Sequence, residues 1–103
     1  MSANVLRTTA SCDDLRRILA FFLDQNEPGV AARFVNGYEK TLTFVADFPD
    51  LGIPWESEER RLNSVRVKPI QGFDKYLVFY RLSGNDVFVL RIFHGHQNID
   101  SLL

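Results

Sequence analysis

The stretch KYLVFYRLSGNDVFVLRIFHGHQNIDSLL, residues 75–103, decides the fold. Residues 76–82 and 87–93 are two runs rich in β-branched and aromatic side chains, and the segment between them contains Gly84. Two such runs around a short glycine-containing connection predict a β-hairpin. The chain is then expected to leave the sheet at His94 and to end in a short polar tail.

A further strand is predicted just before this hairpin, over residues 64–68, and Pro69 is expected to end it. Its two valines face one way, and Arg66 and Lys68 face the other. Such alternation predicts a half-buried strand with a basic outer face. The segment before it, residues 53–61, is predicted to be a polar loop in which Trp55 either plugs the edge of the core or is an exposed contact.

Two apolar stripes with helical spacing precede these strands. The first consists of Leu15, Ile18, Leu19, Phe22 and Leu23, and the second of Ala31, Phe34, Val35, Tyr38, Leu42 and Val45. Ser11 is the expected N-cap of the first helix, with Asp13 and Asp14 in its first turn. Pro28 suits the first turn of the second helix, and Pro49 ends it by restricting Phe48.

Residues 4–8 are expected to form a short opening strand, which gives the order β-α-α-β-β-β. Helices grouped before a strand meander predict an α+β fold, with a helical hairpin packed on a mainly antiparallel β-sheet. The length of 103 residues fits a single domain over residues 1–103.

The composition indicates a soluble, cytoplasmic protein. About 46% of the residues are apolar, but no run approaches the roughly 20 residues that span a membrane. Residues 1–14 lack the basic-then-apolar pattern of a signal peptide. Cys12 is the one cysteine, so an internal disulfide is impossible, which suits a reducing compartment.

Charge is distributed unevenly along the chain. The formal net charge is −1, but residues 60–96 hold seven basic and two acidic side chains, a formal charge of +5. This bias indicates an anionic partner that meets one face of the sheet. A solvated strand face with ordinary lysines and arginines would give the same numbers.

The sequence contains no convincing metal or cofactor site. His94 and His96 lie two residues apart without a cysteine or carboxylate partner, and no glycine-rich phosphate loop is present. Basic side chains alone can cleave RNA when a base activates the 2′-hydroxyl and a cation stabilises the phosphorane. The groups available for this are Arg66, Lys68, Arg81, Arg91, His94 and His96. The same side chains could instead grip a partner.

The strand motifs also carry a family resemblance. They are Val65-Arg66-Val67, Tyr76-Leu77-Val78-Phe79-Tyr80-Arg81, Val89-Leu90-Arg91-Ile92-Phe93-His94-Gly95 and the closing Ile99-Asp100-Ser101-Leu102-Leu103. With these motifs the chain resembles the RelE/ParE superfamily of bacterial type II toxin–antitoxin systems, and the ParE branch most of all. The upstream helices agree with this resemblance over nearly the whole chain.

Two departures from the family pattern bear on activity. ParE-like chains commonly follow the His-Gly pair with Arg-Asp, where this chain has Gln97 and Asn98. Arg66 and Lys68 match two basic positions of RelE-like nucleases, whereas Leu77, Gln97 and Leu103 replace their further basic and aromatic groups. Loss of one transition-state cation typically costs about 2–4 kcal/mol. The resemblance therefore implies a toxin that binds its target and is not itself an efficient enzyme.

The resemblance implies a target protein, in this family DNA gyrase, and a cognate antitoxin that fills an apolar groove between helices and sheet. The implied target-binding residues are Arg61, Arg66, Arg81, Arg91, His94, His96 and Gln97. A homodimer or a toxin–antitoxin hetero-oligomer is expected.

Two rival interpretations remain open from the sequence. One is a RelE-like, metal-independent mRNA endonuclease that acts on the ribosome with Arg66, Lys68, His94 or His96 as weak catalytic candidates. The other is a decayed, non-toxic homologue, which the replacements at Gln97 and Asn98 would explain.

Overall fold

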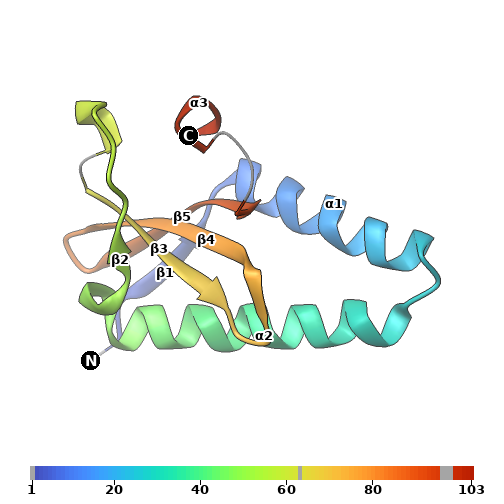
Figure 1. Ribbon diagram of the computed structural model, residues 1–103. Coiled ribbons are helices and arrows are strands. Elements are labelled where there is room, and N and C mark those ends of the chain that lie inside the picture. Colours follow the sequence, from blue (N-terminus) through green and yellow to red (C-terminus); the bar gives the residue numbers. More distant parts are fainter. Residues whose placement is uncertain (1, 63, 96–98) are drawn as a thin grey trace.

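The computed structural model describes residues 2–62, 64–95 and 99–103, except for the side chain of Arg61. Figure 1 shows a curved sheet with one long helix running along one face and a short C-terminal helix above the other. The elements are β1 (Asn4–Arg7), α1 (Thr9–Asp24), α2 (Pro28–Asp47), η1 (Pro49–Leu51), β2 (Ile53–Pro54), η2 (Arg60–Leu62), β3 (Val65–Ile70), β4 (Phe73–Ser83), β5 (Asp86–His94) and α3 (Ile99–Leu102).

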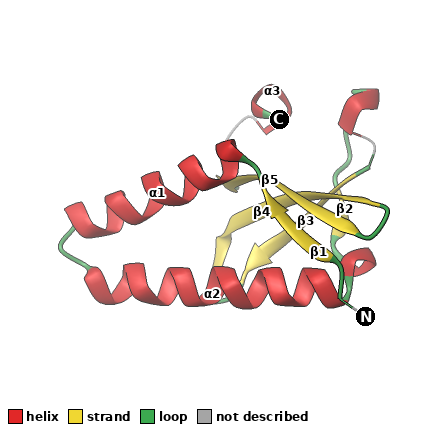
Figure 2. Cartoon of the chain, turned by 180° about the vertical axis from the view of Figure 1, so that it is seen from behind, coloured by secondary structure: helices red, strands yellow, loops and turns green. Residues whose placement is uncertain are grey.

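The sheet has the strand order β1-β5-β4-β3-β2. β1 pairs in parallel with β5, and the other neighbouring strands are antiparallel. The predicted hairpin is β4 and β5, joined at Gly84, whose φ of 60° suits a tight turn. Seen from behind, α1 and α2 form a hairpin beside and beneath this sheet (Figure 2). These features confirm the α+β fold with a mainly antiparallel sheet.

The start of α1 differs from the sequence prediction. Thr8 is the N-cap, because its Oγ1 accepts a hydrogen bond from the Ser11 backbone N–H at 3.1 Å. Ser11, the predicted N-cap, lies inside the helix and is buried. Asp13 and Asp14 consequently fall beyond the first turn, and Asp14 points into the protein.

The helix stripes face the core with two corrections. Leu23 and Val35 belong to the predicted stripes but are exposed, and Gly37 and Thr41 take the place of Val35 on the buried face of α2. Gly37 is needed there because a Cβ would stand 2.3 Å from the carbonyl oxygen of Gln71. The expected start of α2 at Pro28 is confirmed.

Both faces of the sheet bury apolar side chains. The cluster on the helix side contains Phe34, Tyr38, Leu42, Ile70, Val78, Val89 and Ile92. The cluster on the opposite face, here called the outer cluster, contains Leu62, Val65, Val67, Phe79, Phe93 and Ile99, with Trp55, Leu77, Leu90 and Leu103 at its margin.

The outer cluster overturns the prediction of a basic outer face on β3. Val65 and Val67 lie in this cluster, on the face away from α2, so Arg66 and Lys68 lie on the same side as α2. The strand also continues past its predicted end to Ile70. In the described part of the chain, β2 pairs with β3 at Arg66 and Val67. Pro69 lies beyond this pairing, on an open edge of the sheet, where proline is tolerated.

Two segments predicted to be irregular contain short elements. β2 and η2 lie within the predicted loop, and α3 lies within the predicted polar tail. Trp55 does pack against the core edge, with its ring centroid 5.3 Å from that of Phe79, and Ile99 of α3 is buried. Among the described residues, no helix has the length and apolar character needed to cross a membrane.

Candidate functional site

Arg81 and Arg91 lie on the outer face of the sheet. The residue opposite Arg81 on β3 is Val65, and the residue opposite Arg91 on β4 is Phe79, both members of the outer cluster. Arg81 Nε donates to Ser64 Oγ at 2.7 Å. The two arginines line one hollow of about 380 Å³ together with Thr8, Ala10, Leu62, Leu90, Leu102 and Leu103.

A buried carboxylate holds Arg91. Asp14 is 1% exposed, and its Oδ2 accepts hydrogen bonds from Arg91 Nε at 2.8 Å and from the Ile92 backbone N–H at 3.0 Å. Its Oδ1 accepts one from Arg91 Nη2 at 2.9 Å. Burial alone would raise the pKa of Asp14, but these hydrogen bonds and the charge of Arg91 outweigh burial and lower the pKa below its usual value.

Arg66 and Lys68 have structural contacts on the other side of the sheet. Arg66 Nη1 donates to the backbone carbonyls of Asp50 at 3.1 Å and Gly52 at 2.8 Å. Lys68 Nζ lies 4.7 Å from the centroid of the Phe44 ring. These contacts fasten β3 to α2 and to the segment after it, so both side chains already have a role in the fold.

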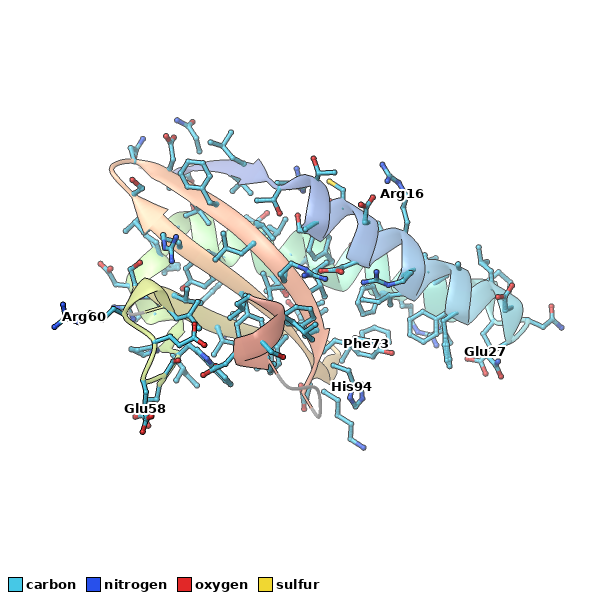
Figure 3. All side chains as sticks on the ribbon, turned by 90° about the horizontal axis from the view of Figure 1, so that it is seen from above. Arg16, Glu27, Glu58, Arg60, Phe73 and His94 are labelled. Carbon is cyan, nitrogen blue, oxygen red and sulfur yellow. The ribbon has the colours of Figure 1, made fainter. Side chains whose placement is uncertain are left out.

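His94 lies at the end of β5 on the helix side, near Phe73 at the same end of the sheet (Figure 3). Its ring and that of Tyr76 form a T-shaped pair, with 5.2 Å between centroids. A hollow of about 310 Å³ opens there and is lined by Arg17, Ile18, Phe21, Tyr76, Ile92, Phe93 and His94. This hollow, here called the helix-side groove, combines aromatic rings with two basic side chains.

The predicted site residues therefore fall into separate places. The sheet separates Arg66 and Lys68 from Arg81 and Arg91, and His94 stands in the helix-side groove. His96 and Gln97, together with Asn98 and the side chain of Arg61, lie outside the described residues. Within the described ranges, no group of three or more histidine, cysteine, aspartate or glutamate side chains could hold a metal ion.

Asp14 and Arg17 are absent from the site residues that the sequence predicts. The available signal was the position of Asp14 on the helix, because a residue four before Ile18 falls on the apolar stripe. A carboxylate within an apolar stripe calls for a buried cation or N–H donor, and Arg91 and the Ile92 N–H supply both.

Comparison with known proteins agrees with this architecture. A family model described as "ParE toxin of type II toxin-antitoxin system, parDE" matches residues 5–99. The curated protein "Toxin ParE3" of Caulobacter vibrioides is 33% identical over 99 residues, which cover 96% of this chain and 93% of that protein.

Two solved structures share the fold. A chain of the chromosomal ParDE toxin–antitoxin system from P. aeruginosa superposes with a TM-score of 0.72 at 18% identity, covering 90% of this chain and 96% of that one. A chain of the toxin–antitoxin complex RelBE2 from Mycobacterium tuberculosis superposes with a TM-score of 0.63 at 22% identity, covering 91% and 99%.

Proposed function

Because the chain belongs to the ParE family of type II toxin–antitoxin toxins, we propose that it arrests growth by binding a target protein, without turning over a substrate. The family resemblance makes DNA gyrase the expected target. A cognate antitoxin neutralises the toxin by binding it in the cytoplasm, and the chain acts as one domain.

The separation of the basic residues by the sheet carries this proposal. RNA cleavage without a metal needs a base, a cation and an acid around one phosphate. Arg66 and Lys68 lie on the α2 side, whereas Arg81 and Arg91 lie on the outer face. The outer face beside Arg81 and Arg91 is apolar, because Val65, Val67 and Phe79 are buried there. This arrangement supports a binding surface more than a cleavage site.

We assign the target contact to the outer hollow with Arg81 and Arg91. Two arginines beside an apolar floor resemble the centre of a protein interface, in which arginine is enriched and other charges are depleted. Leu90, Leu102 and Leu103 supply the apolar part of this hollow. An acidic patch on the target would complete the contact.

We assign the antitoxin contact to the helix-side groove. Phe21 is 48% exposed there, Arg17 and His94 are basic, and none of the described residues that line the groove is a carboxylate. An amphipathic segment that carries an apolar side chain next to a carboxylate fits such a groove. The two partners thus use separate hollows, which both border β5.

The proposal is tested by inducing the chain in bacteria and by adding the purified protein to a gyrase supercoiling assay. We expect growth arrest, a DNA-damage response and loss of supercoiling, all relieved by the cognate antitoxin. Codon-phased mRNA 5′ ends produced with translating ribosomes, with gyrase unaffected, would instead establish the RelE-like endonuclease.

The decayed alternative has its own test. A soluble wild-type chain that leaves growth unimpaired would contradict the proposal. If Gln97→Arg together with Asn98→Asp then made that inert chain toxic, it would be identified as a decayed homologue.

A further inference from the structure

One carboxylate joins the two hollows. Asp14 Oδ1 accepts hydrogen bonds from both Arg17 Nη2 and Arg91 Nη2, and Oδ2 accepts from Arg91 Nε. Arg17 reaches into the helix-side groove and Arg91 into the outer hollow. Asp14 itself is 1% exposed, so the two arginines share a single buried anion.

The two arginines differ in access. The Arg17 side chain is 67% exposed, so a ligand in the helix-side groove can reach it. The Arg91 side chain is 23% exposed, and its Nη1 donates to the carbonyl oxygen of Leu102 in α3 at 3.1 Å. Arg91 is therefore the link between the buried carboxylate and the C-terminal helix.

From this geometry we propose that Asp14 is a positioning residue that couples the helix-side groove to α3: an acidic group bound to Arg17 leaves the carboxylate to Arg91 and so tightens the hold of Arg91 on Leu102. The inference rests on the proposed function in taking the groove ligand to be the antitoxin. The linkage itself concerns only Asp14, Arg17, Arg91 and α3.

The physical reason is that hydrogen bonds to one buried acceptor are not independent. When Arg17 is drawn away by another carboxylate, the full negative charge of Asp14 is available to Arg91. A more firmly held guanidinium keeps its third contact, to Leu102, for a larger fraction of time. Coupling is reciprocal, so any partner that displaces α3 weakens the site at Arg17 in the same proportion.

The chain contains reporters of α3 that need no partner. The Leu103 backbone N–H donates to the Ile99 carbonyl at 2.9 Å, and its exchange with solvent reports opening of α3. Trp55, the one tryptophan, donates from Nε1 to Asp100 Oδ1 at 2.6 Å. Quenching of its fluorescence by acrylamide therefore reports loss of the α3 contact.

The experiment uses Arg17→Ala in the full chain, because this change frees Asp14 as a bound acid would. We expect exchange of the Leu103 amide to slow by about fivefold, at the lower end of typical coupling. Quenching of Trp55 should fall with it. In Asp14→Asn, both should rise above the wild-type values, and adding Arg17→Ala to that variant should change nothing further.

The matched control is Arg16→Ala. Arg16 pairs with Asp13 at 2.7 Å with the same i,i+3 spacing, and it points away from the body of the molecule (Figure 3). Equal effects of Arg16→Ala and Arg17→Ala, or an Arg17→Ala effect that persists in the Asp14→Asn variant, would overturn the coupling. If Asp14→Asn does not fold, the comparison of Arg16→Ala with Arg17→Ala still decides.

These readouts separate two failures. Growth and gyrase assays test the proposed function and do not enter this measurement. If the chain is not toxic but Arg17→Ala slows exchange as expected, the proposed function is wrong and the coupling stands. If the chain is toxic but Arg17→Ala has no effect, only the coupling is wrong.

Discussion

Gly52 lies against Tyr80 so closely that a Cβ atom on residue 52 would stand 1.9 Å from the Tyr80 hydroxyl oxygen. That hydroxyl donates to the Pro49 carbonyl oxygen at 2.7 Å. The segment after α2 is thus pinned to β4, and Arg66 adds its bonds to Asp50 and Gly52 from β3. Three carbonyl oxygens between residues 49 and 52 are satisfied in this way.

Replacing Gly52 by alanine should destabilise the protein, because the Tyr80 ring must shift and its hydrogen bond to the Pro49 carbonyl is then strained. We expect a loss of about 1–3 kcal/mol in the free energy of unfolding, measured by urea denaturation. Gly29→Ala is the control, since its Cβ would meet Arg33 at an ordinary 3.6 Å. A Gly52→Ala variant as stable as wild type would show that the close approach is not required.

Comparing this segment with the β4–β5 hairpin shows which elements sequence patterns can predict. The hairpin of β4 and β5 followed from alternation and a glycine turn, because both signals are local. β2 has only two residues, Ile53 and Pro54, and no propensity marks it as a strand. Its position comes from Tyr80 and Arg66, whose hydrogen bonds cross 31 and 14–16 positions of the chain.

The candidate site was predictable only in part, for a related reason. Alternation correctly predicted that Arg81 lies on the other face of the sheet from Tyr80, and that Arg91 shares the face of Phe93. It could not tell which face of β3 would meet α2, because Trp55 and Ile99 bury the outer face from distant parts of the chain. The prediction for the side of Arg66 and Lys68 is wrong for that reason.

Asp14→Asn should show how much the buried ion pair contributes to stability. Removing one partner of such a pair typically costs about 3–5 kcal/mol, so we expect a loss of that size near neutral pH. Asp13→Asn is the control, because its pair with Arg16 is exposed and is worth less than about 1 kcal/mol.

The pH dependence has a definite sign. The folded pKa of Asp14 lies below the reference value of 3.8 for the unfolded chain. The contribution is therefore complete above pH 3.8 and declines as the pH falls through the folded pKa. The difference in stability between wild type and Asp14→Asn should narrow in acid denaturation below about pH 4. A difference that stays constant down to about pH 2 would show that Asp14 is not the ionised partner of Arg91.

Arg66→Ala separates a structural role from a catalytic one. Because Arg66 donates to two backbone carbonyls, we expect a stability loss of about 1.5–3 kcal/mol, typical of hydrogen bonds from charged groups. Growth inhibition per amount of folded protein, measured with soluble protein quantified in each culture, should stay the same. Ribosome-dependent mRNA cuts that vanish in this variant would identify Arg66 as a catalytic group.

Arg81→Glu tests the outer hollow as the target surface. Reversing one charge beside Arg91 should weaken binding to an acidic patch by about 2–5 kcal/mol if the contact is buried. The inhibition of supercoiling should fall accordingly, while antitoxin binding measured by calorimetry should persist. Lys75→Glu makes the same change at an exposed position of β4 that does not line the hollow, and it should leave inhibition intact.

Phe21→Asp tests the helix-side groove as the antitoxin surface. Phe21 is half exposed, so the substitution removes apolar area from the helix-side groove without opening the core, and it adds a negative charge near Arg17. We expect an antitoxin segment that carries both apolar and acidic side chains to bind this variant at least about 10-fold more weakly, a loss of about 1.4 kcal/mol. Toxicity should remain, and co-expressed antitoxin should no longer relieve it.

Leu23→Asp is matched in chemistry and exposure but lies outside the groove, so it should still be neutralised. If both variants escape the antitoxin equally, the contact extends over α1 beyond the groove; if neither does, the antitoxin binds elsewhere.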